Sequence, residues 1–161
     1  MNAIARFARV SPEQYRRDAA AFQQVMPVEE IPLPRRATRG SAGYDFICPV
    51  EAEILPDQTV TIPTGLRAFI QPGWVLICCP RSSMGRKWGM RLANTIGVVD
   101  SDYVNADNEG HMLLMVVNGG DKPFVLHPGD RFCQGLFLPF GLAEEEEVTA
   151  ERHGGYGSTG Q

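Results

Sequence analysis

Short apolar or alternating runs, each closed by a turn signal, fill the chain from residue 28 onward. Proline, glycine and aspartate make up these turns, as at residues 71–73 and 127–130. Many short strands with regular turns are typical of an all-β sandwich or barrel. The strands that this pattern predicts are Thr59–Ile62, Leu66–Ile70, Trp74–Cys79, Thr95–Val99, Met112–Val117, Phe124–Leu126 and Arg131–Leu138.

Two helices are expected beside the strands. Ser11 can cap a helix, Pro12 suits the first helical position, and Gln14 completes a capping box. This pattern predicts a packing or subunit-contact helix from about Pro12 to Gln24, and a second short helix over Ser82–Lys87. The chain then divides into an N-terminal helical extension (residues 1–27), a β domain (28–143) and a flexible C-terminal arm (144–161).

Composition excludes several classes of protein. The chain has 161 residues with 43% hydrophobic content, enough for one domain with a real core. A net charge of −4 does not suit a binder of nucleic-acid polymers. No apolar run approaches the length of a membrane span, and the start lacks the apolar core of a secretory signal, although an arginine-rich transit peptide stays an alternative. Reduced thiols in the cytoplasm are expected, because no zinc spacing joins Cys48, Cys78, Cys79 and Cys133.

Two small-residue segments could meet a phosphate. Gly-Ser-Ala-Gly-Tyr-Asp at residues 40–45 places an acid at a strand entry, and a plain turn explains it equally well. Pro-Arg-Ser-Ser-Met-Gly at residues 80–85 puts Arg81, Ser82 and Ser83 at an expected helix start. An arginine with two hydroxyls and free backbone N–H groups suits a phosphate.

A third segment, at residues 94–103, ends an apolar strand in Asp-Ser-Asp-Tyr. Asp100 could be a general base that activates water, or it could cap a hairpin turn. A calcium loop is excluded, because Val104 stands where a ligand is needed and Asn105 where glycine is needed.

The last two segments are a turn before a strand and a glycine-rich end. Gly-Asp-Arg-Phe-Cys-Gln occupies residues 129–134, and residues 152–160 read Arg-His-Gly-Gly-Tyr-Gly-Ser-Thr-Gly. The second segment cannot pack a core, so it is either a disordered end or an arm that wraps a polyphosphate.

Together the five segments, in this order and spacing, resemble the five motifs of the homotrimeric dUTPases, from about residue 28 to the C-terminus. The resemblance implies a jelly-roll-like β-barrel or sandwich. It implies hydrolysis of dUTP to dUMP and pyrophosphate with Mg²⁺, by attack of water on the α-phosphorus. It also implies a cytoplasmic homotrimer whose sites are shared between subunits.

The resemblance gives roles to the residues around the base and sugar. Asp100 would position and deprotonate the attacking water. Tyr103 would pack against the deoxyribose and exclude the 2′-hydroxyl of UTP. The hairpin that includes Val99 would read uracil through its backbone, and Asn94 would hold substrate or an ordered water.

The resemblance gives the phosphate contacts in the same way. Asp45 would orient Arg81 or a magnesium-bound water, while Mg²⁺ takes its main ligands from the nucleotide. The arm would order over bound nucleotide. The other residues expected to touch substrate are Ser82, Ser83 and Gln134 in the β domain, and Arg152, Tyr156, Gly157, Ser158 and Thr159 in the arm, where Tyr156 would stack on uracil.

Two departures from the family pattern leave alternatives. Residues 104–109 add about five residues to the hairpin, and the arm is one residue shorter than usual.

The related dCTP deaminases need a carboxylate three residues before Asn118, and this chain has Met115 there. His111 could be an acid–base group, but a backbone anchor or a surface residue is favoured. A regulatory protein partner could use residues 104–109 and the N-terminal helix.

Overall fold

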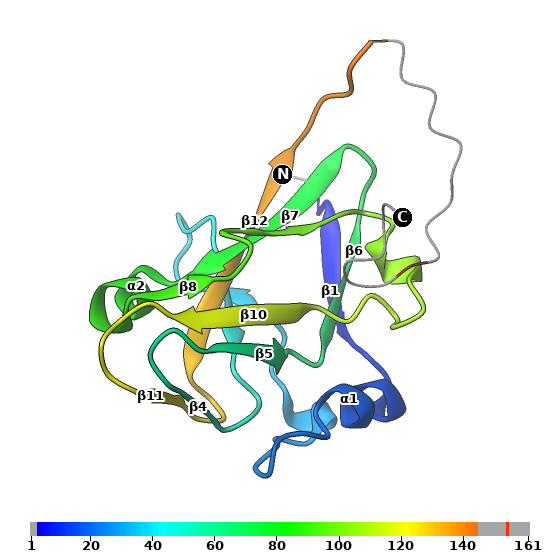
Figure 1. Cartoon of the computed structure of the whole chain (residues 1–161). Coiled ribbons are helices and arrows are strands. Elements are labelled where there is room, and N and C mark those ends of the chain that lie inside the picture. Colours follow the sequence, from blue (N-terminus) through cyan, green and yellow to red (C-terminus); the bar gives the residue numbers. More distant parts are fainter. Residues whose placement is uncertain (1–2, 145–153, 155–161) are drawn as a thin grey trace.

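The computed structural model describes residues 3–144 and Gly154. Within them, antiparallel strands pair into four sheets, and the all-β jelly-roll expectation is confirmed (Figure 1). The strands are β1 (Ala5–Arg9), β2 (Arg35–Arg36), β3 (Tyr44–Ile47), β4 (Ala52–Ile54), β5 (Thr59–Pro63), β6 (Leu66–Ile70), β7 (Trp74–Pro80), β8 (Met90–Leu92), β9 (Gly97–Val99), β10 (Leu113–Asn118), β11 (Phe124–Leu126) and β12 (Arg131–Pro139).

The largest sheet has the order β2-β3-β12-β7-β9, so the last strand in the sequence lies at its centre. Gln134 of β12 lies opposite Asp45 of β3 on one side and Cys79 of β7 on the other. The register with β3 shifts between Arg131 and Cys133, where β12 carries one extra residue. Such a bulge bends a strand and redirects its side chains.

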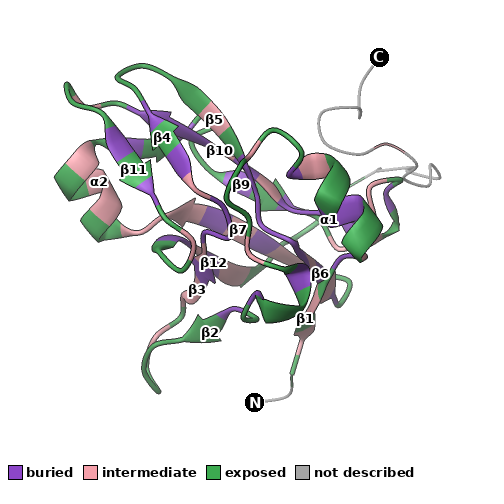
Figure 2. Ribbon diagram, turned by 90° about the horizontal axis from the view of Figure 1, so that it is seen from below, coloured by how far each residue is buried: buried purple, intermediate pink, exposed green. Residues whose placement is uncertain are grey.

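The remaining sheets are β5-β10-β8, β4-β11 and β1-β6. Buried and exposed residues alternate along the short strands, so every second side chain points toward a common core (Figure 2). Phe46 of β3 and Phe132 of β12 are both fully buried there. Phe7 of β1 contacts the rings of Phe46 and Phe137 at centroid distances of 5.8 and 5.6 Å.

The N-terminal segment contains the expected helix but differs from expectation in two ways. Helix α1 spans Pro12–Asp18, with the Ser11 side chain accepting the N–H of Gln14 as a cap. The helix ends at Asp18 instead of near Gln24, and strand β1 before it was not expected. Because Tyr15 belongs to the main core cluster, this segment packs as part of the β structure.

The other expected elements are present. The predicted strands match β5, β6, β7, β9, β10, β11 and β12 within two residues at each end, and the helix after Arg81 is α2 (Ser82–Trp88). Two 3-10 turns, η1 (Val28–Glu30) and η2 (Tyr103–Asn105), complete the chain's regular structure in the described residues. No helix in these residues is long and apolar enough to cross a membrane.

Candidate functional site

A carboxylate on β3 holds two guanidinium groups beside the start of α2. Arg81 Nε lies 3.0 Å from Asp45 Oδ1, and Arg131 Nη1 donates to Asp45 Oδ2 at 3.3 Å. The Asp45 side chain is only 14% exposed, whereas that of Arg131 is 54% exposed. An ion pair with a largely buried carboxylate restricts where a guanidinium can point. Asp45 therefore holds Arg81 beside the start of α2.

The backbone around Arg81 is fixed as well. Strand β7 ends at Pro80, and the N–H of Arg81 donates to the Phe132 carbonyl of β12 at 3.1 Å. Arg81 is the N-cap of α2, so Ser82 and Ser83 form its first turn, where both are exposed. The structure thus brings the Arg-Ser-Ser side chains together with Asp45 on one surface.

Gln134 completes this cluster from the centre of the sheet. Its backbone lies opposite that of Asp45, and its side chain lies over Gly43. A Cβ added at Gly43 would be 2.5 Å from Gln134 Oε1, which is too close for any real side chain. Glycine at residue 43 of the first motif therefore leaves the space that the Gln134 amide occupies. We call Asp45, Arg81, Ser82, Ser83 and Gln134 the phosphate cluster.

The other candidate residues lie around the end of β9. Val99 is buried, while Asp100 directly after it is exposed. Tyr103 is buried, and its hydroxyl donates to the His111 carbonyl at 2.9 Å. Asn94 lies exposed in the turn before β9. An acidic group thus faces solvent beside an aromatic ring held in place.

The phosphate cluster and Asp100 lie at opposite ends of β7. Val99 pairs with Leu76, near the start of β7, whereas Arg81 follows its end. At the rise of a β-strand, the five residue steps from Leu76 to Arg81 separate the two groups by roughly 15–20 Å. In Figure 1, α2 and the yellow-green turn after β9 lie on opposite sides of the molecule. The candidate residues of one chain therefore form two separate groups, which we call half-sites.

Burial makes three of the cysteine thiols poor nucleophiles. Burial raises the pKa of Cys78 to about 12 and that of Cys48 to about 12, and burial raises the pKa of Cys133 as well. All four cysteines are free, as expected. A thiol with a raised pKa stays protonated at neutral pH and reacts poorly.

The candidate residues of the C-terminal arm lie outside the described part of the chain. They are Arg152, Tyr156, Gly157, Ser158 and Thr159.

Comparison with known proteins identifies the family of this chain. The dUTPase family model matches residues 29–160. This chain belongs to the dUTPase family. The deoxyuridine 5′-triphosphate nucleotidohydrolase of Lactococcus lactis subsp. lactis (strain IL1403) is 45% identical over 133 residues, which cover 81% of this chain and 89% of that protein.

Solved dUTPase structures share the fold. The dUTPase of Streptococcus mutans superposes with a TM-score of 0.69 at 37% identity, covering 86% of this chain and 98% of that one. A mutant dUTPase of Staphylococcus bacteriophage 80alpha, solved with dUpNHpp, has the same TM-score at 16% identity, covering 93% of this chain and 98% of that one. At that identity the likeness shows the fold alone.

Three contacts near the dUTPase half-sites have only weak sequence signals. Arg131 reaches Asp45 across the sheet, although the motifs give a role only to Gln134 on that strand. His111 is fully buried and accepts the N–H of Gly65, so it is a backbone anchor and not a surface residue. Asp18 contacts the His111 ring from a helix to which the sequence assigns no chemistry.

Proposed function

We propose that this chain hydrolyses dUTP to dUMP and pyrophosphate, with Mg²⁺, by attack of water on the α-phosphorus. The observation that carries the proposal is the Asp45–Arg81 pair beside two exposed serines, in a chain of the dUTPase family. An arginine held by a carboxylate and flanked by hydroxyls is a preorganised site for phosphate oxygens.

Asp100 is the proposed general base. Its carboxylate takes one proton from water as the water oxygen bonds to the α-phosphorus. The bond from that phosphorus to the bridging oxygen breaks, and its electron pair leaves with pyrophosphate. The exposed position of Asp100 after a buried strand allows a water molecule to approach it.

Tyr103 is the proposed sugar selector, and the backbone around Val99 is the proposed reader of uracil. The buried ring of Tyr103 is held by the hydrogen bond of its hydroxyl to the His111 carbonyl. A ring that cannot move away leaves no room for a 2′-hydroxyl, which disfavours UTP. Asn94, exposed before β9, would hold substrate or an ordered water.

The phosphates would meet the phosphate cluster of a neighbouring subunit. The three phosphorus atoms of a nucleotide are joined through single oxygen atoms, a much shorter span than the separation of Asp100 and Arg81 within one chain. A homotrimer with shared sites brings the two half-sites together. The arm from residue 152 would then close over the phosphates, with Arg152, Gly157, Ser158 and Thr159 on phosphate and Tyr156 on uracil.

The described residues suit a magnesium ion that arrives with the nucleotide. They contain no group of three His, Cys, Asp or Glu side chains placed to hold a metal. Asp45 forms an ion pair with Arg81 through Oδ1 and accepts from Arg131 through Oδ2, which fits a role through Arg81 or through a metal-bound water. When bound to the phosphates, Mg²⁺ would neutralise their charge and favour departure of pyrophosphate. The dUTPase of phage phi11 of Staphylococcus aureus coordinates a structural Mg(II) ion.

A nucleotide panel tests the proposal. With Mg²⁺ present, dUTP should be hydrolysed much faster than dCTP, UTP or dTTP, and chelation of the metal should stop the reaction. Turnover in water enriched in heavy oxygen should place the label in dUMP, because the water oxygen bonds to the α-phosphorus. Label in pyrophosphate would place the attack at the β-phosphorus and contradict the mechanism. Release of ammonia from dCTP would indicate a deaminase.

A further inference from the structure

The hydroxyl of Tyr103 is held by the segment that lengthens its hairpin. Tyr103 Oη donates to the His111 carbonyl at 2.9 Å and accepts from Asn108 Nδ2 at 3.0 Å. Asn108 lies within residues 104–109, and its carbonyl accepts the N–H of His111 at 3.0 Å. The added residues therefore fold back onto Tyr103 instead of projecting from the surface.

The ring of His111 is fixed in one tautomer. The N–H of Gly65 donates to His111 Nε2 at 2.8 Å, so Nε2 carries no proton in the neutral ring. The proton is then on Nδ1, which donates to Asp18 Oδ2 at 2.5 Å. Burial lowers the pKa of His111, and the hydrogen bond and charge of Asp18 oppose that shift. The imidazole is therefore neutral at pH 7, with both nitrogens satisfied.

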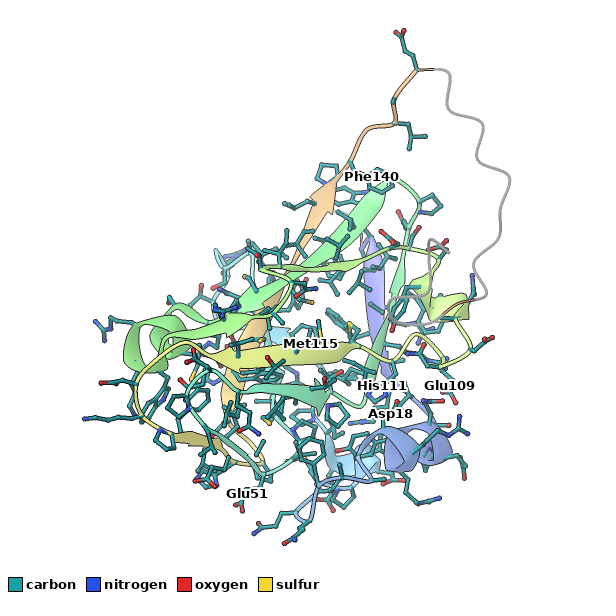
Figure 3. All side chains as sticks on the ribbon, viewed as in Figure 1. Asp18, Glu51, Glu109, His111, Met115 and Phe140 are labelled. Carbon is teal, nitrogen blue, oxygen red and sulfur yellow. The ribbon has the colours of Figure 1, made fainter. Side chains whose placement is uncertain are left out.

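Asp18 is itself oriented from within α1. The same Oδ2 atom accepts from Gln14 Nε2 at 2.8 Å. A second contact ties the start of the helix to the hairpin, since Ser11 donates to Glu109 through its N–H at 2.8 Å and through its hydroxyl at 2.5 Å. Figure 3 shows Asp18, His111 and Glu109 gathered where α1 meets the loop before β10.

From these contacts we infer that Asp18 is a positioning residue for sugar selection, acting through His111 to hold Tyr103 in the place that excludes a 2′-hydroxyl. The inference rests on the proposed function, because it concerns the selectivity given there to Tyr103. It joins helix α1 and residues 104–109 in one network, whose members are Ser11, Asp18, Asn108, Glu109 and His111.

Removal of Asp18 would leave a buried donor without a partner. His111 Nδ1–H would lie fully buried with no acceptor, which is costly enough that the ring shifts or changes tautomer. A change of tautomer would set a proton on Nε2 against the N–H of Gly65. Either change moves the His111 backbone, whose carbonyl holds the Tyr103 hydroxyl. Within residues 3–144, Asp18 forms hydrogen bonds with Gln14 and His111, neither of which is a proposed substrate-binding residue, so its effect on selectivity would pass through Tyr103.

The test compares Asp18→Ala with Asp18→Asn and with Glu13→Ala. In Asp18→Ala, the ratio of kcat/KM for dUTP to that for UTP should fall at least about fivefold, the lower end of the scale expected when a buried donor loses its acceptor. Asp18→Asn should retain the wild-type ratio, because an amide oxygen can accept from both His111 and Gln14. Glu13→Ala removes an exposed acid from the same helix and should leave the ratio unchanged.

A double-mutant cycle separates positioning from general destabilisation. Tyr103→Phe removes only the hydroxyl through which the network acts. In the Tyr103→Phe background, Asp18→Ala should lower the ratio of kcat/KM for dUTP to that for UTP by a much smaller factor than it does in the wild type. Effects of coupled residues are not additive. Full additivity would mean that Asp18 does not act through this hydroxyl, and would overturn the inference.

Imidazole nitrogen NMR of the wild-type protein tests the network without substrate and without a change at Asp18 or Tyr103. The His111 signals, assigned with His111→Gln, should show a neutral ring protonated on Nδ1 at pH 7. A ring protonated on Nε2, or on both nitrogens, would overturn the inference even if Asp18→Ala fails to fold. An unchanged ratio in Asp18→Ala, with a lowered ratio in Tyr103→Ala, would overturn the inference about Asp18 and leave the proposed role of Tyr103 standing. An unchanged ratio in Tyr103→Ala would contradict the proposed role of Tyr103, and the inference with it.

Discussion

At the scale of single residues, the proposed mechanism depends on one exposed carboxylate. Asp100→Asn should lower kcat by about 10²–10⁴, because an amide cannot accept the proton of the attacking water. Nucleotide affinity should stay close to the wild-type value, since the amide has nearly the same shape. Single-turnover kinetics and a separate binding titration would measure the two effects. A variant that keeps wild-type kcat would contradict the role of Asp100 as the base.

His111 should make the free energy of unfolding depend on pH. Burial holds its pKa below the ordinary value of 6.5 in the folded protein. As the pH falls below that value, the unfolded chain binds a proton that the folded chain resists, so stability decreases until the pH reaches the lower, folded pKa. Urea unfolding at a fixed protein concentration, from roughly pH 8 down to pH 5, should show this decrease.

His111→Gln should weaken the pH dependence in that window. His127→Gln is the matched control, because the His127 side chain is 60% exposed and contacts Glu51 at the surface. The control should keep the wild-type slope. Equal slopes for His111→Gln and the wild type would show that His111 does not carry this effect.

At the scale of elements, the turn between η2 and β10 requires glycine at residue 110. Gly110 has a φ of +71°, and a Cβ there would lie 2.6 Å from Val104 Cα. Gly110→Ala should therefore destabilise the protein by at least about 1 kcal/mol, from the left-handed backbone alone. Gly141→Ala, where nothing lies within 4 Å, is the control. Thermal unfolding would compare them, and an equal Tm would argue against the close packing of this turn.

Strands with an apolar signal of their own could be predicted from the sequence, whereas β1 and β2 could not. A run such as Trp74–Cys79 carries its own apolar signal, and β7 follows it closely. Strand β1 contains Arg6 and Arg9, and β2 has only two residues, both exposed. Such segments are strands because neighbouring strands offer hydrogen-bond partners, which no local pattern reveals.

The same limit applies to the helix and the site. The alanines and glutamines between Asp18 and Val25 suit a longer helix, yet the helix ends at Asp18 and Val25 forms a bridge with Val50. The five motifs indicate which residues belong to the phosphate cluster and to the hairpin. They do not indicate that Asp18 meets His111, because that contact joins residues 93 positions apart and depends on how the strands fold.

At the scale of the whole molecule, the separation of the half-sites predicts an assembly. Light scattering should give three times the mass of one chain. Chains with Asp100→Asn should be inactive, as should chains with Arg81→Ala, because each lacks one half-site. After subunit exchange in an equal mixture, about a quarter of the sites should combine an intact Asp100 with an intact Arg81 from a neighbour.

In that equal mixture, activity should return to about a quarter of the wild-type rate, because about a quarter of the sites are intact. The control mixes Asp100→Asn chains with chains that carry both Asp100→Asn and Arg81→Ala. No site in that mixture has an intact Asp100. If exchange is confirmed and activity does not return, each chain must contain its own complete site.

The position of β12 has a consequence for biosynthesis. This strand separates β3 from β7, yet it leaves the ribosome after nearly all of the described chain. Until then, the two strands that will flank it present unpaired edges, which favour association with other chains. The fold therefore closes late in translation or after release, and it depends on contacts between distant residues, which form slowly. A nascent chain that stalls before residue 131 should accumulate as an aggregation-prone intermediate that chaperones recognise.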